Sequence, residues 1–390
     1  MENIEEISIQ WESSGYSVLK ALPASILGIF CEFIDNSIQS SKQQKDNILK
    51  IEPNYKLRID INYDGNEIII QDSAGGINEY NFVRALKPAN KADDIKGLNE
   101  FGLGMKYAAV WISNEWELIS SAIGEDVERS VIFNYHDVVN NNIEKLPCKN
   151  RNVGRDSHYT KVILRNLEQK HVNKFPRSFL EKKLPFIYRN FIREQSSFFD
   201  DYREDNIEIF LFNNQKPLKW EEYGFLKKWW YKDYQVDLNK EANLHEWKYK
   251  IPLTPTEYEE EVQDQKGNII KVKKPIKISG FIGILPDGQQ KGKNGFVLFR
   301  RGRVVEGSEA RIFPKMISGV SPRAAKSIRL FGELHFSNVD VSFDKSKLSI
   351  SQKRKEEIFG VLAAMIKKVV FETDPKKREL NFINQAEKYR

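Results

Sequence analysis

Residues 56–77 have the sequence KLRIDINYDGNEIIIQDSAGGI, in which two alternating apolar and polar runs are separated by Asp64 and Gly65. Such runs around an Asp-Gly pair predict a β-hairpin. The second strand ends at Asp72, before a glycine turn that includes Gly76. An aspartate there can accept a hydrogen bond from an exocyclic amine, while glycines let the backbone approach a purine ring. The alternative is an ordinary turn that binds nothing.

A helix is predicted before the hairpin, because apolar residues recur every three to four positions across residues 16–41. Pro23 is expected to divide it into a short lead-in and a longer helix. Within it, CEFIDNS at residues 31–37 places Glu32 and Asn36 on adjoining parts of one helical face. A carboxylate that orients water and an amide oxygen that binds Mg²⁺ suit phosphoanhydride hydrolysis. Alternatively, both side chains simply face solvent.

After the hairpin, GLNEFGLGMKYAAVWIS at residues 97–113 predicts a glycine loop that opens a helix. Gly102, Gly104 and Lys106 lie where this helix is expected to begin. Free backbone amides, the positive end of the helix dipole and a lysine form an anion site that suits a triphosphate. The stretch lacks the full G-x-x-x-x-G-K-[ST] pattern, which argues against the P-loop class.

Three further strands are predicted at residues 116–122, 128–135 and 160–167, with an Asn-rich basic connection over residues 140–158. They extend the sheet that the hairpin begins. The helices and strands together predict an α+β fold, an α/β sandwich that ends near Leu167.

In this order, the acidic helix, the aspartate turn and the glycine loop resemble the motifs of the GHKL ATPases. That superfamily includes gyrase B subunits, the ninety-kilodalton heat-shock chaperone, MutL and the MORC proteins. CEFIDNS, QDSAGGI and EFGLGMKYAA are most similar to MORC-type and related prokaryotic members. The resemblance implies a Bergerat-type nucleotide domain with a mixed sheet covered by helices. It also implies that ATP and Mg²⁺ bind and that ATP is hydrolysed to ADP and phosphate.

The resemblance implies roles for single residues as well. Glu32 matches the general base, Asn36 the Mg²⁺ ligand and Asp72 the acceptor of the adenine amine. Gly76 matches a residue that lines the base. Gly102, Gly104 and Lys106 match the phosphate loop. Thr160 matches a threonine beside the aspartate. Two departures stand out, D-S-A-G-G where D-x-G-x-G is common, and Asn99 where a lid glycine is frequent. Asparagine tolerates left-handed backbone angles, so a lid remains compatible with it.

The rest of the chain is predicted to form a helical hinge at residues 176–199 and then a β-rich unit. Residues 295–351 resemble the βαβ-containing transducer domain of the same superfamily, in which a lysine reaches the γ-phosphate. Lys345 matches that lysine and Lys347 is the second choice; a solvated Asp-Lys surface turn is the alternative. The expected domains are an ATP-binding domain, a transducer-like domain, and an amphipathic helix with a tail: residues 1–170, 171–351 and 352–390.

Two features of this second region could contact DNA or a protein. Residues 220–234 are dense in aromatic and lysine side chains, which can stack on bases and meet phosphates. A basic set suits a DNA backbone: Lys266, Lys271, Lys273, Lys274, Lys291, Lys293, Arg300, Arg301 and Arg303. Core packing is the alternative for the first feature and solvated loops for the second. Residues 254–274 and 286–295 are both expected to be exposed loops.

The composition sets broad limits. Sixty-one basic residues against 55 acidic ones give a net charge of +6, which names no partner by itself. Cys31 and Cys148 are the only cysteines, too few for a disulfide framework or a cysteine-rich zinc site. The first residues do not resemble a signal peptide, and no apolar run is long enough to span a membrane. A cytoplasmic or nucleoid-associated protein without a membrane partner is therefore expected.

Two functions remain open at this point. One is an ATP-driven clamp or switch. In it, a lid around residues 87–99 becomes ordered when ATP binds, and two protomers pair through their N-terminal segments. DNA is a possible target of this switch. The other is a nucleotide-sensing regulatory module with little turnover that controls a partner effector such as a nuclease. A histidine kinase is disfavoured, because all five histidines follow the acidic helix and both glycine motifs: His136, His158, His171, His245 and His335.

Overall fold

The computed structural model describes residues 13–86, 104–172, 177–194, 203–221, 228–231, 234–237, 245–263, 269–284, 294–307, 312, 330–337, 339–342 and 345–368. The chain divides into two compact units. The first comprises residues 1–185, 191–198 and 203–219, and the second comprises residues 186–190, 199–202 and 220–390.

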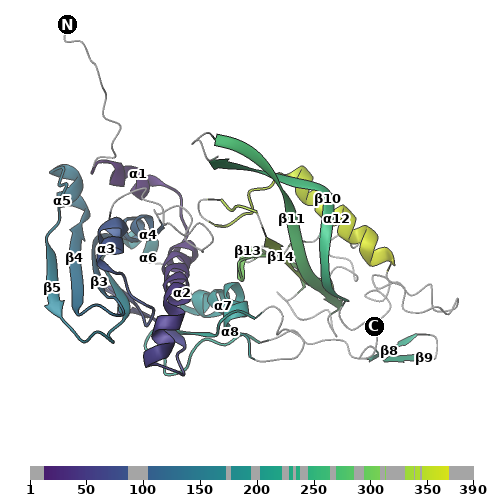
Figure 1. Ribbon diagram of the computed structural model, residues 1–390, viewed down its shortest axis with the longest axis horizontal. Helices are drawn as coiled ribbons and strands as arrows, with labels where there is room; N and C mark the ends of the chain where they lie inside the picture. The colour runs from purple at the N-terminus through teal and green to yellow at the C-terminus, as the bar shows by residue number, and fades with distance from the viewer. Residues whose placement is uncertain are drawn as a thin grey trace, which may run out of the picture. The chain divides into compact units, whose positions relative to one another are not determined.

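The first unit is built on a seven-stranded mixed sheet with the order β5-β4-β3-β6-β2-β1-β7 (Figure 1). The strands are β1 (Leu57–Tyr63), β2 (Ile68–Asp72), β3 (Ser113–Ser121), β4 (Val127–Asn134), β5 (Cys148–Asn152), β6 (Tyr159–Leu167) and β7 (Ile207–Leu211). All neighbours are antiparallel except β1 and β7, which are parallel. The predicted hairpin is confirmed, because β1 pairs with β2 around the turn at Asp64 and Gly65.

Helices cover one face of this sheet. They are α1 (Gly15–Ala21), α2 (Ile26–Ile51), α3 (Glu79–Leu86), α4 (Gly104–Ile112), α5 (Tyr135–Asn140) and α6 (Gln169–Val172); α7 (Arg177–Ile187) and α8 (Arg189–Ile192) follow. Helix α2 packs on β1, and α4 packs on β3 and β6 (Figure 1). Alternate strand residues such as Ile59, Ile61 and Leu164 are fully buried, while Arg58 and Asp60 form an ion pair on the solvent side. The predicted α/β sandwich is therefore confirmed.

Lys20 on α1 closes the C-terminal end of α4. Its Nζ donates to the carbonyl oxygen of Val110 at 2.9 Å and pairs with Glu168 at 3.0 Å. The backbone N–H of Glu168 donates to the carbonyl oxygen of Ile112 at 2.9 Å. Carbonyl groups of the last helical turn lack partners inside a helix, so a lysine there satisfies them and favours the negative end of the helix dipole. Helix α4 is thereby fixed at this end to both α1 and the exit of β6.

Three local predictions for the first unit differ from the structure. Helix α2 continues past the predicted end to Ile51, because Ile48 is a further fully buried residue on its inner face. The predicted connection over residues 140–158 contains β5, whose five residues are all exposed and therefore lack an alternating pattern. Strand β7 was expected in the second region, yet it pairs with β1. Parallel pairing joins segments far apart in the chain, and a short apolar run does not reveal its partner.

The second unit contains a five-stranded sheet with the order β10-β11-β14-β12-β13. The strands are β10 (His245–Gln263), β11 (Ile269–Ile284), β12 (Gly295–Arg300), β13 (Arg303–Glu306) and β14 (Leu330–Ser337). Strands β12 and β14 are parallel, which requires a crossover connection between them. A separate pair, β8 (Lys228–Tyr231) and β9 (Tyr234–Asp237), is antiparallel, and the predicted C-terminal helix is present as α12 (Gln352–Lys368).

The predicted exposed loop over residues 254–274 is wrong, because most of it belongs to the β10–β11 hairpin. The cross-strand register places Glu259 opposite Lys273 and Glu261 opposite Lys271. Most of the second predicted loop, residues 286–295, lies outside the described residues.

Two arginines of the predicted basic set are buried, although solvated loops or a DNA-binding surface were expected for the set. Arg300 and Arg303 are 8 % and 5 % exposed, so neither side chain is a surface contact for DNA. In the same unit Arg189 and Glu333 form a fully buried ion pair at 2.7 Å.

In the part of the chain that the structure describes, no helix is long and apolar enough to cross a bilayer.

Candidate functional site

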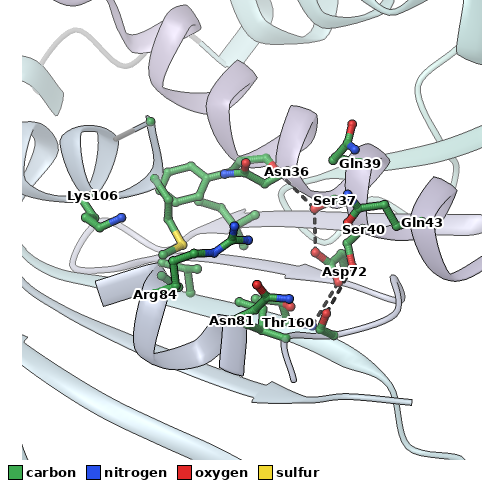
Figure 2. A pocket seen from close by; sticks show the side chains of 18 residues that line it. Asn36, Ser37, Gln39, Ser40, Gln43, Asp72, Asn81, Arg84, Lys106 and Thr160 are labelled. Atoms are coloured by element: carbon green, nitrogen blue, oxygen red, sulfur yellow. Dashed lines mark hydrogen bonds between the residues drawn. The ribbon is translucent and has the colours of Figure 1, made fainter. Parts of the chain in front are cut away.

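The three sequence motifs meet at one cavity in the first unit (Figure 2). Its walls come from α2, the turn after β2, α3, the start of α4, and β6. Six of the predicted site residues line it: Asn36, Asp72, Gly76, Gly104, Lys106 and Thr160. The proximity is an observation, whereas the roles predicted for these residues stay predictions.

Asp72 lies at the end of β2, on the sheet side of this cavity. Its carboxylate accepts hydrogen bonds from three donors. Its Oδ1 accepts from the backbone N–H groups of Ala74 and Thr160, each at 3.0 Å, and its Oδ2 accepts from the Ser37 hydroxyl at 2.6 Å. A carboxylate has about four acceptor positions, so one position remains for a ligand donor. Burial raises the pKa of Asp72, although all three hydrogen bonds favour the ionised form.

The strand register explains why Asp72 faces the helices. Side chains alternate across a strand, so Asp72 shares its face with the buried Ile68 and Ile70. Thr160 stands directly opposite Asp72 on β6, and Ser120 stands opposite Thr160 on β3. The hydroxyls of Ser120 and Thr160 are 3.1 Å apart. A row of polar groups therefore crosses three strands beneath α2.

Ser37 was not singled out in the sequence, although it directly follows the acidic motif. It lies four residues after Phe33 on the buried face of α2 and is 4 % exposed. A buried hydroxyl on an otherwise apolar helical face needs a hydrogen-bond partner, and the pattern could have indicated one.

Two further residues outside the motifs hold the turn after β2. The Tyr55 hydroxyl donates to the carbonyl oxygen of Ser73 at 3.0 Å, and Nδ1 of His158 is 2.9 Å from the carbonyl oxygen of Ala74. His158 is buried, and its Nε2 is 3.2 Å from Glu52. Because Nε2 faces a carboxylate and Nδ1 faces a carbonyl, the ring connects the turn to the end of α2.

Gly76 occupies a position that excludes any side chain. Its φ is +72°, and a Cβ atom there would lie 1.9 Å from the carbonyl oxygen of Ser121. Gly76→Ala is expected to lower the free energy of unfolding by at least about 2 kcal/mol, from the left-handed angle and the collision together. Chemical denaturation measures this difference.

Two other glycines supply matched controls for that change. A Cβ atom on Gly154 would have no atom within 4 Å, and its φ is ordinary, so Gly154→Ala should be nearly neutral. Gly65 also has open space but a φ of +102°, so Gly65→Ala isolates the cost of the backbone angle. Equal stability losses for Gly76→Ala and Gly65→Ala would contradict the collision with Ser121.

Glu32 lies against the start of α4, although it is not among the residues that line the cavity. A Cβ atom on Gly104 would lie 2.0 Å from Oε2 of Glu32, so only glycine lets the carboxylate approach this closely. Glu32 is 7 % exposed and lies one helical turn before Asn36. The acidic motif and the glycine loop are thus in direct contact, as their predicted cooperation requires.

Lys106 supplies a buried cation to the cavity. Its side chain is 3 % exposed, and burial followed by the nearby charge of Arg84 lowers its pKa to about 8. Figure 2 shows Lys106 and Arg84 on the side of the cavity away from Thr160. The site therefore has a hydrogen-bonding end around Asp72 and a cationic end around Lys106.

Other predicted residues lie elsewhere or outside the described residues. Gly102, Asn99 and the lid over residues 87–99 are outside them. Lys345 belongs to the second unit, where it is 5 % exposed and has a φ of +51°, which is uncommon for a residue other than glycine. The alternative of a solvated turn therefore does not hold for the buried Lys345, whereas Lys347 is exposed.

The mixed sheet covered by helices, with a polar cavity under its longest helix, is consistent with the Bergerat fold of GHKL ATPases. Residues 25–160 match the family model described as histidine kinase-, DNA gyrase B- and HSP90-like ATPase. The match begins at the N-cap of α2 and ends at Thr160, so it includes all the residues that line the cavity except Val162. No curated protein of similar sequence was found.

Proposed function

We propose that this protein binds ATP in the cavity of the first unit, hydrolyses it slowly, and acts as a nucleotide-gated dimerising clamp or switch. The observation that supports this most strongly is that the two ends of the cavity carry side chains of opposite charge. A carboxylate with a remaining acceptor position lies at one end, and a buried lysine at the N-terminus of α4 lies at the other. These ends suit the adenine amine and the phosphates, respectively.

In this proposal each end of the site does separate work. Asp72 accepts the adenine amine, and Thr160 and Gly76 border the base. Lys106 and the backbone N–H groups at the start of α4 bind phosphate oxygens. Glu32 accepts a proton from the water that attacks the terminal phosphorus, and its contact with Gly104 keeps the carboxylate beside the phosphate site.

Magnesium fits the donor set around Asn36. The described residues hold no group of three or more His, Cys, Asp or Glu side chains suited to a metal. Mg²⁺ commonly takes only one or two protein oxygens and completes its shell with phosphates and waters, so a single amide oxygen from Asn36 is compatible with it. When bound, the ion would neutralise charge on the phosphate oxygens.

In this proposal the second unit reads the nucleotide state of the first. The parallel pair of β12 and β14 is compatible with a βαβ-containing transducer. The left-handed, buried Lys345 supports a functional role, because strained backbone angles concentrate at functional sites. In this role Lys345 would sense the γ-phosphate and favour its transfer.

The test of the proposed function is titration calorimetry with ATP and a phosphate-release assay on the full chain. ATP binding with slow phosphate release is the expected result, and no ATP binding would refute it. Binding without any release would favour the nucleotide-sensing module that controls an effector. Release measured with and without DNA tests DNA as a target, and light scattering with a non-hydrolysable ATP analogue tests dimerisation.

The lowered pKa of Lys106 gives a pH dependence with a definite sign. Phosphate binds the charged lysine, which predominates below a pKa of about 8. Above that pH, a proton must be taken up together with ATP, so the affinity should fall by up to about tenfold per pH unit. Calorimetry at pH 7, 8 and 9 measures this. Lys106→Arg stays charged and should lose the slope, and an equal affinity of the native protein at pH 7 and 9 would contradict the prediction.

A further inference from the structure

Arg84 lies on α3 and is a residue that none of the three motifs contains. It lines the same cavity as Asp72 and Lys106 (Figure 2). Helix α3 begins at Glu79, shortly after the glycine turn, and ends at Leu86. Helix α3 thus brings a second cation to the site, in addition to the lysine of α4.

The charges around the cavity are unequally distributed. Among the described lining residues Asp72 is the one carboxylate, and three protein donors already contact it. Arg84 and Lys106 are the two cations of the lining, and they are close enough for the charge of Arg84 to lower the pKa of Lys106. Lys106 is buried and Arg84 is half-buried. Two like charges that lie close together in such a site repel one another, and a polyanion between them would make a favourable interaction with each.

We propose that Arg84 is a phosphate-binding residue, whose guanidinium contacts the phosphate chain of the bound nucleotide opposite Lys106 and so selects polyphosphates over nucleosides. This inference rests on the proposed function and deepens it. Arginine suits the position because its planar fork donates two parallel hydrogen bonds to phosphate oxygens, whereas a lysine acts as a point charge.

The position of α3 gives this contact a structural consequence. The hydroxyl of Tyr16, on α1, donates to the carbonyl oxygen of Leu86 at 2.8 Å, two residues after Arg84. Phosphate bound by Arg84 therefore fixes the last turn of α3, and that turn is hydrogen-bonded to the N-terminal helix.

Calorimetry on the full chain with ATP, ADP, AMP and adenosine tests the assignment. Arg84→Gln is expected to weaken ATP binding by about 10- to 100-fold, the range for a hydrogen bond to a charged group, and to leave adenosine binding within about twofold. Arg84→Lys should recover part of the ATP affinity. Arg155→Gln is the matched control, because Arg155 is a largely exposed arginine of the same unit and should bind all four ligands normally.

The outcomes separate this inference from the proposed function. If the native protein binds no nucleotide, both are overturned. If the native protein binds ATP and Arg84→Gln binds it equally well, only the role of Arg84 is overturned. An equal loss for ATP and adenosine would also overturn it, because Arg84 would then shape the pocket and not contact phosphate. A second readout needs no ligand: Arg84→Gln should raise the pKa of Lys106, measured by the pH dependence of its acetylation.

Discussion

Glu32→Ala is expected to bind ATP with nearly native affinity while releasing phosphate about 100 to 10,000 times more slowly, the range for loss of a general base. Glu32 is buried on α2 and lies against Gly104, so its carboxylate can face a water held beside the phosphates. Because it is not placed to contact the base or to neutralise the phosphates, its loss should affect turnover and not binding. Calorimetry and single-turnover phosphate release measure the two quantities separately.

Glu204→Ala is the control for this change. Glu204 is a partly exposed glutamate of the same unit that pairs with Lys42 at 2.7 Å, and neither residue lines the cavity. Its replacement should leave both binding and turnover unchanged. Unimpaired hydrolysis by Glu32→Ala would remove Glu32 from the role of base, whereas loss of ATP binding would show that the side chain serves the pocket itself.

Asp72→Asn is expected to weaken ATP binding by about 100-fold, the cost of a lost hydrogen bond to a charged acceptor together with a misplaced donor. The new amide group would direct N–H donors at the exocyclic amine or at the Ser37 hydroxyl, which is itself the donor in the native contact. The fold should survive, because burial raises the pKa of Asp72 and a neutral amide avoids that cost of desolvation. Competition between ATP and a fluorescent ATP analogue measures the affinity.

Asp60→Asn provides the comparison for Asp72. Asp60 lies on the adjacent strand β1, on the solvent face, where it pairs with Arg58 at 2.7 Å. Its replacement should change ATP affinity by less than about twofold, since exposed ion pairs contribute little. Similar affinity losses for the two variants would mean that Asp72 does not contact the base.

Much of the fold follows from local patterns in the sequence. The hairpin and the strands with one buried face show alternation, and α2 shows the helical period, so these elements could be predicted. Strand β5 could not, because all five of its residues are exposed. The full length of the β10–β11 hairpin could not be predicted, because Pro252 and Pro255 suggest loops. The register of β10 is irregular over this stretch.

The cavity residues that could be predicted are those that belong to a short sequence motif. Asp72, Asn36 and Lys106 belong to short patterns whose residues lie on one element each, and the structure brings these elements to one cavity. Arg84 belongs to none of the motifs, and His158 contacts a partner distant in the chain, the carbonyl oxygen of Ala74. No local pattern reports such a partner, because the contact exists only once the sheet has formed.

Helix α4 is held by charged side chains at its C-terminal end. Lys20 and Glu168 secure its final turn to α1 and to the end of β6, while its first turn borders the cavity. A helix fixed in this way transmits small displacements along its axis without bending, so any shift of its first turn would reach α1.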